Sequence, residues 1–281
     1  MRRMGKVITK RILAFCLVAA VCVMSWTAVP KAELLRDGDY NYTVAEKVEN
    51  GVYQMICETA GSLPNAVTGQ LIPIDYVESL ETAYLTAILI PGEDEESDED
   101  LRTRYFETLE SQAYGGNVTD YKQKTNAIEG VGGVKVTPVW NGGGTVKLTI
   151  IASDYTVPST TLIEKVQKEM DAVAPIGHIV TVDGVTKKEI RIETQIAYQS
   201  GWSWKTSGTY IQNAIDSYFL ELAKNWASSE QLIVRISQIE TRILDCAGVI
   251  DIANTKINGK AENCMLEEHA IPVRGSVSDG S

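Results

Sequence analysis

The sequence has few histidines and none of the short motifs that assemble a catalytic site. His178 and His269 are the only two histidines, which excludes a three-histidine metal site, and the run 267–269 lacks the HExxH spacing that places two ligands on one helical face. No GxSxG turn is present to expose a serine nucleophile. Carboxylate pairs remain a catalytic option, because spacing in sequence does not show which of them converge. We predict no enzyme, no catalytic residue and no cofactor, with a carboxylate-dependent hydrolase as an alternative.

Cysteines and basic stretches are also scarce. Cys16 and Cys22 lie in an apolar run, and the other three cysteines have no CxxC spacing for zinc or redox chemistry. The 26 lysines and arginines against 37 acidic residues leave a net charge of −11. No basic stripe is present to neutralise phosphates and release their counterions. We predict no metal site, no nucleic-acid partner and no small-molecule substrate.

The first thirty residues differ in amino-acid composition from the remainder of the chain. "MRRMGKVITKR" is basic, and residues 12–26 are almost all apolar, which is the architecture of a signal peptide. The run is short for a membrane span, which needs about 20 apolar residues, and no small-x-small pair marks a cleavage site. We interpret residues 1–30 as a signal-like leader or a spurious start. A membrane is a partner only if residues 12–26 act as an anchor.

The most unusual stretch is acidic: seven of the eight residues from 93 to 100 are Asp or Glu. Ser97, followed three residues later by Asp100, predicts a capped helix start, and the carboxylates favour the positive end of the helix dipole. Leu101, Tyr105 and Leu109 recur every fourth residue, so we expect a helix over about 98–112 that buries this stripe. A calcium loop is disfavoured because the glycine that such a loop needs is missing.

The pattern of the remaining chain predicts an α+β protein. We expect a β-rich region over 31–91, a first α+β unit over 92–185, a second α+β unit over 186–273 and a loose tail over 274–281. "IEGVGGVKV" at 128–136 and "LDCAGVIDI" at 244–252 share a helix, glycine stop and strand pattern, so the two α+β units are expected to be of similar design.

Several local signals within these regions are specific enough to test. Asn50-Gly51 and the glycine-rich 141–144 predict turns of β-hairpins. Ser237 and Glu240 predict a capping box for a helix ending at Leu244. For His178, at the start of a strand, we expect a partly buried, hydrogen-bonded imidazole.

Three stretches carry a family resemblance: "IPGEDEESDEDLRTRY", "YGGNVTDYKQKTNAIEGVGGVKVTPVWNGGGTVKLTII" and "APIGHIVTV". Together they resemble the baseplate J family of contractile phage tails, in particular members from defective prophages of Gram-positive bacteria. The likeness runs from about residue 35 to residue 273. It implies a structural wedge subunit with no catalytic residues, which assembles with other wedge and hub proteins in a sixfold ring. The N-terminus is atypical, because family members usually carry a further region where this chain has its basic and apolar leader.

Residues for subunit contacts follow from this interpretation. We expect Glu95, Glu96 and Asp98, together with the aromatic residues Trp202 and Trp204, to form the interface. The protein would then reside in the baseplate of a virion or tail-like particle assembled in the cytoplasm of a bacterial host. The alternative from another functional class is an exported cell-surface or envelope binding module that uses residues 1–30 as a signal or anchor.

Overall fold

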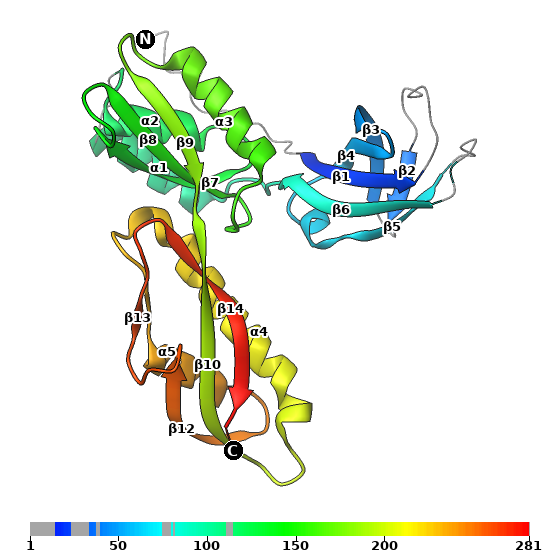
Figure 1. Cartoon of the computed structure of the whole chain (residues 1–281), viewed down its shortest axis with the longest axis vertical. Helices are drawn as coiled ribbons and strands as arrows, with labels where there is room; N and C mark the ends of the chain where they lie inside the picture. The colour runs from blue at the N-terminus through cyan, green and yellow to red at the C-terminus, as the bar shows by residue number, and fades with distance from the viewer. Residues whose placement is uncertain are drawn as a thin grey trace. The chain divides into compact units, whose positions relative to one another are not determined.

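The computed structural model describes residues 15–23, 34–37, 40–74, 80, 82–110 and 115–280, and their side chains from Tyr40 onward except 107–110. The chain divides into two compact units, Met1–Gly184 and Val185–Ser281. The residues that the structure describes form five α-helices and several small sheets, so the fold is α+β, as the sequence predicts (Figure 1). Within the described residues no helix is both long and apolar enough to cross a membrane.

The first part of the N-terminal unit is a closed barrel with strand order β1-β4-β3-β2-β5-β6. Its strands are β1 (Phe15–Val23), β2 (Leu34–Asp37), β3 (Tyr40–Glu49), β4 (Val52–Ala60), β5 (Gly69–Pro73) and β6 (Thr82–Ile90), with a short 3-10 helix, η2 (Leu63–Ala66), after β4. The predicted hairpin is confirmed: β3 and β4 are antiparallel, and Gly51 has a φ of 81° in the turn. Buried Tyr42, Tyr53 and Met55 fill the barrel core from this hairpin.

The apolar run expected in a leader supplies a strand of this barrel. Residues 15–23 form β1, which pairs antiparallel with both β4 and β6. A short continuous apolar run fits a strand with neighbours on both sides as well as it fits a leader, and periodicity does not separate the two. The other residues of the expected leader, 1–14 and 24–30, lie outside the described residues.

The second part of the N-terminal unit, the central domain, follows α1 (Asp98–Glu110). It contains α2 (Val118–Asn126), β7 (Val131–Pro138), β8 (Thr145–Ala152), α3 (Thr160–Val173) and β9 (Ile179–Gly184). The predicted hairpin around 141–144 is confirmed, since β7 and β8 are antiparallel, and β9 runs parallel to β8. The core between helices and sheet includes the buried residues Tyr121, Ile128, Val134, Leu148, Ile150, Leu162, Val166 and Met170.

The C-terminal unit is built on the long strand β10 (Thr186–Tyr198). It continues with α4 (Trp204–Lys224), η3 (Trp226–Ser228), β11 (Ile233–Val234), α5 (Ile236–Leu244), β12 (Val249–Ile257), β13 (Cys264–Met265) and β14 (Ala270–Asp279). β10 lies between β12, to which it is antiparallel, and β14, to which it is parallel. Alternate residues of β10, among them Ile190, Ile192 and Ile196, are buried, which is the period of a strand with one covered face.

Two expectations for this unit are wrong. The tail is not loose, because residues 274–279 continue β14, and the Asp279 carboxylate accepts hydrogen bonds from the Tyr198 hydroxyl at 3.0 Å and the Ile196 N–H at 3.3 Å. Ser237 does not cap α5, since the helix already begins at Ile236. The Asn263 side chain accepts the hydrogen bond of the Ile236 N–H at 3.0 Å in its place. Both contacts come from residues far along the chain, which local patterns do not report.

The similarity between the two α+β parts lies in their sheets and in one shared turn. Each has a central strand that is antiparallel to one neighbour and parallel to the other. In each, a helix is followed by a short turn whose last residue is a glycine with positive φ, Gly130 at 93° and Gly248 at 84°, directly before a strand. The chain order differs, because β7 precedes its central strand whereas β12 follows its own. The two matching nine-residue stretches therefore share a local structure, although the strands of the two sheets follow one another in a different order along the chain.

Candidate interaction surface

The acidic segment first serves as a clamp between the barrel and the central domain. The Asn65 side chain exchanges two hydrogen bonds of 2.8 Å with the N–H and C=O of Gly92, just after β6. The Asp94 carboxylate accepts hydrogen bonds from the N–H and the hydroxyl of Ser62 at 2.7 and 2.5 Å, and these bonds lower its pKa. The Glu93 carboxylate accepts the Gly130 N–H at 2.7 Å on the other side.

The remaining acidic residues divide into those that shape α1 and those that face outward. Glu96 forms a two-point ion pair with Arg104, at 2.9 and 2.7 Å. The capped start is confirmed, because the Asp100 N–H donates to the Ser97 hydroxyl at 3.2 Å and that hydroxyl donates to the Asp100 carboxylate at 2.6 Å. Glu95 and Asp98 are exposed, and no described residue forms a hydrogen bond or ion pair with either carboxylate.

The apolar stripe of α1 is not buried, which corrects the sequence expectation. Leu101, Tyr105 and Phe106 are 38%, 57% and 54% exposed, and the rings of Tyr105 and Phe106 pack edge to face with centroids 5.9 Å apart. The side chain of Leu109 lies outside the described residues. The spacing predicts the helix correctly, but no element among the described residues packs on its apolar face. We call Glu95, Asp98, Leu101, Tyr105 and Phe106 the α1 surface.

The tryptophans expected at an interface pack against glycines of their own unit. The Trp202 ring lies so close to Gly248 that a Cβ there would come within 2.2 Å of it, and Trp202 remains 36% exposed. The Trp204 ring covers Gly208 in the first turns of α4, at 3.3 Å from the Cβ position. Both rings therefore have a structural role and present only part of their surface to a partner.

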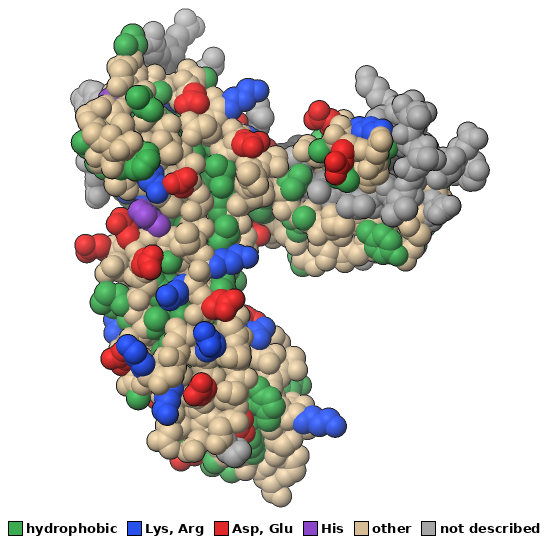
Figure 2. Space-filling model, viewed as in Figure 1, with side chains coloured by type: hydrophobic (Ala, Val, Ile, Leu, Met, Phe, Trp, Pro, Cys, Tyr) green, Lys and Arg blue, Asp and Glu red, His purple; other side chains and the backbone are tan. Residues whose placement is uncertain are grey.

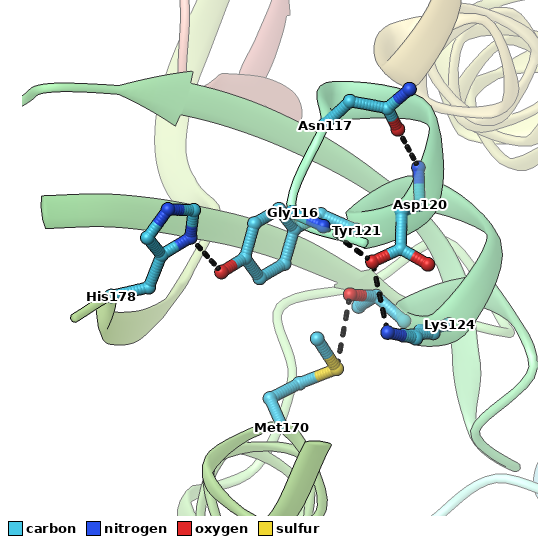
Figure 3. A network of polar contacts seen from close by, with 8 residues as sticks. Gly116, Asn117, Asp120, Tyr121, Lys124, Met170 and His178 are labelled. Atoms are coloured by element: carbon cyan, nitrogen blue, oxygen red, sulfur yellow. Dashed lines mark hydrogen bonds and ion pairs between the residues drawn. The ribbon is translucent and has the colours of Figure 1, made fainter. Parts of the chain in front are cut away.

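A polar network ties α2 to the start of β9 (Figure 3). The Tyr121 hydroxyl and His178 Nδ1 are 2.8 Å apart, which confirms the partly buried, hydrogen-bonded histidine. Asp120 accepts hydrogen bonds from the Gly116 N–H at 2.9 Å and from Lys124 at 2.8 Å. Burial alone would raise the pKa of Asp120, but these two partners outweigh it and lower the pKa. The network holds a helix start and a loop together.

Other charged groups are spread over the surface. On the face drawn in Figure 2, acidic and basic side chains of the C-terminal unit are interspersed. Ion pairs such as Arg274 with Asp216 at 2.7 Å and Arg242 with Glu221 at 2.5 Å connect neighbouring elements there. Among the described residues, no group of three His, Cys, Asp or Glu side chains is placed to hold a metal ion.

Comparison with known proteins gives matches to one family along most of this fold. The baseplate J-like central domain matches residues 113–184, and the baseplate J-like protein C-terminal domain matches residues 190–278. These ranges cover the central domain and the C-terminal unit. Neither includes the barrel or α1.

Two curated relatives come from Bacillus subtilis (strain 168). The chain is 35% identical over 232 residues to the phage-like element PBSX protein XkdT and 38% identical over 231 residues to YqbT. Each alignment covers 79% of this chain, and the chain spans about 65% of the length of these relatives. Among solved structures, a chain of the anti-feeding prophage baseplate, 6-fold symmetrised, aligns over 97% of this chain and 79% of its own length, at a TM-score of 0.48 and 9% identity.

Proposed function

The chain belongs to the baseplate J-like family, and from this membership we propose that it is a structural component of the baseplate of a phage tail or tail-like particle. The observation that carries the proposal is the match of both α+β parts to consecutive domains of that family. The name of one relative, a phage-like element protein, supports a particle of prophage origin. The protein would act through contacts with other subunits, without catalysis.

The partners in this proposal are other wedge and hub proteins, arranged in a sixfold ring. Glu95 and Asp98 are the best placed of the expected contact residues, because they are exposed and lie beside exposed apolar side chains. Apolar side chains at the centre of a contact with charges at its rim are the usual arrangement of a protein interface. Trp202 and Trp204 offer a second contact of smaller area, and Glu96 contributes indirectly by holding Arg104 of α1.

Fractionation of the producing bacterium tests this function. We expect the full-length chain to sediment with sheath and tube proteins in large particles after gentle lysis, and to be released when the particles are dissociated. A chain found in the envelope or the medium, with a shortened N-terminus and no particle association, would contradict the proposal and favour an exported binding module. Sheath and tube proteins are the internal control, because they show that particles were present in the sample.

A further inference from the structure

Asparagine is followed by glycine at three places in the chain, 50–51, 141–142 and 258–259. This dipeptide is chemically labile, because the glycine has no Cβ to hinder attack of its backbone nitrogen on the asparagine side chain. The attack requires the asparagine Cγ to reach that nitrogen in a near-attack geometry. A fold that holds the side chain elsewhere therefore slows the reaction, and a fold that leaves the side chain free allows it.

Asn141-Gly142 and Asn258-Gly259 are two such sites in closely similar surroundings. Both asparagines are exposed, and both glycines have a positive φ, 95° for Gly142 and 79° for Gly259. Among the described residues, no heavy atom beyond the chain neighbours lies within 4 Å of the Cβ position of either glycine. The exposure of the asparagines and the space around the glycines therefore do not distinguish the two sites.

The side chain of Asn258 is bound to the neighbouring strand. Its Oδ1 accepts the Arg191 N–H at 2.9 Å, and its own N–H donates to the Arg191 C=O at 2.8 Å, so Asn258 continues the pairing of β12 with β10. Ile257 and Lys260 exchange backbone hydrogen bonds of 2.8 and 3.0 Å around the turn. The φ of Asn258 is 50°, and positive φ at both central residues is the signature of a type I′ turn. To reach the Gly259 nitrogen, the Asn258 side chain must leave the Arg191 N–H without its acceptor.

The side chain of Asn141 is not held in this way. No described residue forms a hydrogen bond with its amide group. Thr145 binds the backbone around it, because its hydroxyl accepts the Asn141 N–H at 3.0 Å and donates to the Gly142 C=O at 2.7 Å. Neither of these backbone groups takes part in the ring closure. The side-chain amide of Asn141 is therefore free to turn toward the Gly142 nitrogen.

We propose that Asn141 is a site of spontaneous deamidation in the folded protein and that Asn258, in the same dipeptide, is protected. The Gly142 nitrogen loses its proton and forms a bond to Asn141 Cγ, the Cγ–Nδ2 bond breaks, and ammonia leaves with that proton. The product is a five-membered cyclic imide. Water then opens either C–N bond of the imide and yields aspartate or isoaspartate. The proposal is independent of the baseplate assignment, because it concerns the chemistry of one chain.

The reaction changes the turn between β7 and β8. It adds a negative charge directly after two exposed apolar residues, Val139 and Trp140, which are 62% and 43% exposed. In the isoaspartate product the backbone is also longer by the side-chain methylene group. A population of this protein therefore comes to contain chains that differ in charge and backbone length at residue 141, while the turn at residue 258 stays the same in all of them.

Peptide mapping by mass spectrometry of the full-length chain, incubated at mildly alkaline pH in water enriched in 18O, tests the proposal. The alkaline pH favours loss of the Gly142 N–H proton, and uptake of 18O marks conversion during the incubation. We expect Asn141 to convert on the order of tenfold faster than Asn258 in the folded chain, because ring closure at Asn258 also has to break the hydrogen bond from Arg191. Conversion of Asn258 as fast as that of Asn141 would overturn the proposal.

The same chain unfolded in guanidinium chloride is the matched control, since unfolding removes the hydrogen bond from Arg191 and leaves the local sequence unchanged. We expect the rate at Asn258 to rise there to near the rate at Asn141. A difference as large as in the folded chain would show that the residues after each glycine set the rates, which would overturn the protection by the fold.

Asn141→Gln tests the assignment to this residue. The longer side chain cannot form the five-membered imide, so 18O uptake and isoaspartate should disappear from the peptide that contains residue 141, and the rate at Asn258 should stay as it is. Isoaspartate that persists in this peptide would place the reaction at another residue and overturn the assignment.

Discussion

Carboxylates that are neighbours in the sequence have different roles in the fold. Asp94 holds Ser62 of the barrel, Glu93 holds the Gly130 N–H of the central domain and Asp100 completes the cap of α1. Glu95 and Asp98, which lie between them, are exposed. The acidic stretch is therefore mainly a connection between two parts of the chain. Only a minority of its charges is available to a partner.

At the residue scale, Gly248→Ala is expected to be strongly destabilising. The φ of 84° costs a non-glycine residue about 1 to 2 kcal/mol, and the new methyl group would come within 2.2 Å of the Trp202 ring, which adds about 1 to 3 kcal/mol for overpacking. We expect a total loss of about 2 to 5 kcal/mol in the free energy of unfolding, measured by urea denaturation.

Gly259→Ala is the matched control for this substitution. Its φ is 79°, and among the described residues no heavy atom beyond its two chain neighbours lies within 4 Å of the Cβ position, so only the backbone cost of about 1 to 2 kcal/mol is expected. The difference between the two variants measures the contact with Trp202. Equal losses would show that the ring moves away at little cost and that Gly248 is needed only for its φ.

At the scale of elements, α1 and α3 show that the spacing of apolar residues predicts a helix but does not predict whether another element packs on its apolar face. Both carry apolar residues every fourth position and both begin at a serine cap. Leu162, Val166 and Met170 of α3 are buried against the central sheet, whereas Leu101 and Tyr105 of α1 are exposed. The difference comes from the neighbours of each helix, because a stripe is buried only where another element faces it.

Another feature at this scale is the protection of the edge strand β9. Gln167 of α3 accepts a hydrogen bond from the Val182 N–H at 2.8 Å and donates one to the Val180 C=O at 3.0 Å. Its amide thus pairs with β9 as a further strand would. Exposed strand edges invite pairing with other chains, and natural proteins cover them.

Gln167→Leu should therefore destabilise the N-terminal unit and open this edge. Two partly buried backbone groups lose their partners, which is expected to cost about 2 kcal/mol, and exchange of the Val182 amide hydrogen should accelerate. Urea denaturation and hydrogen exchange measure these effects. Lys168→Leu, at the exposed adjacent position of α3, should change stability by less than about 0.5 kcal/mol. An unchanged Val182 exchange rate would show that Gln167 does not protect the edge.

At the scale of the whole molecule, the family matches fall on the two α+β parts, while the barrel and α1 precede them. The closed barrel has no free strand edge, so its described strands pair only with one another. Contacts with other subunits are then expected to use side chains, as on the α1 surface.

Assembly should be sensitive to charge on the α1 surface. We expect Glu95→Lys combined with Asp98→Lys to reduce incorporation of the chain into particles on the order of tenfold, because the rim charge is reversed. Glu96 stays unchanged, so that its ion pair with Arg104 keeps α1 intact. Quantitative mass spectrometry of purified particles measures the effect.

Glu164→Lys combined with Glu169→Lys makes the same change of charge on exposed positions of α3 and serves as the control. Normal incorporation of the α1 variant, or equal loss in both variants, would remove the α1 surface from the list of subunit contacts. The proposed baseplate function would still stand in that case, since it rests on the family matches.

The sequence alone determined the features that depend on residues close together along the chain. These are the β3–β4 and β7–β8 hairpins, the Ser97 cap and the order of helix, glycine and strand at Gly130 and Gly248. The family resemblance also came from the sequence, because it rests on ordered stretches of residues. All of these features depend on the spacing of apolar residues and on the residues in turns, and both act over a few positions of the chain.

The tertiary structure decided the features that depend on contacts between distant residues. It placed residues 274–279 in a strand beside β10, capped α5 with Asn263 and used most of the acidic stretch as a clamp. It also left the stripe of α1 exposed and set Trp202 against Gly248. The partners in these contacts are separated by tens of residues, and burial or pairing at that range follows from how the elements pack, which local patterns do not contain.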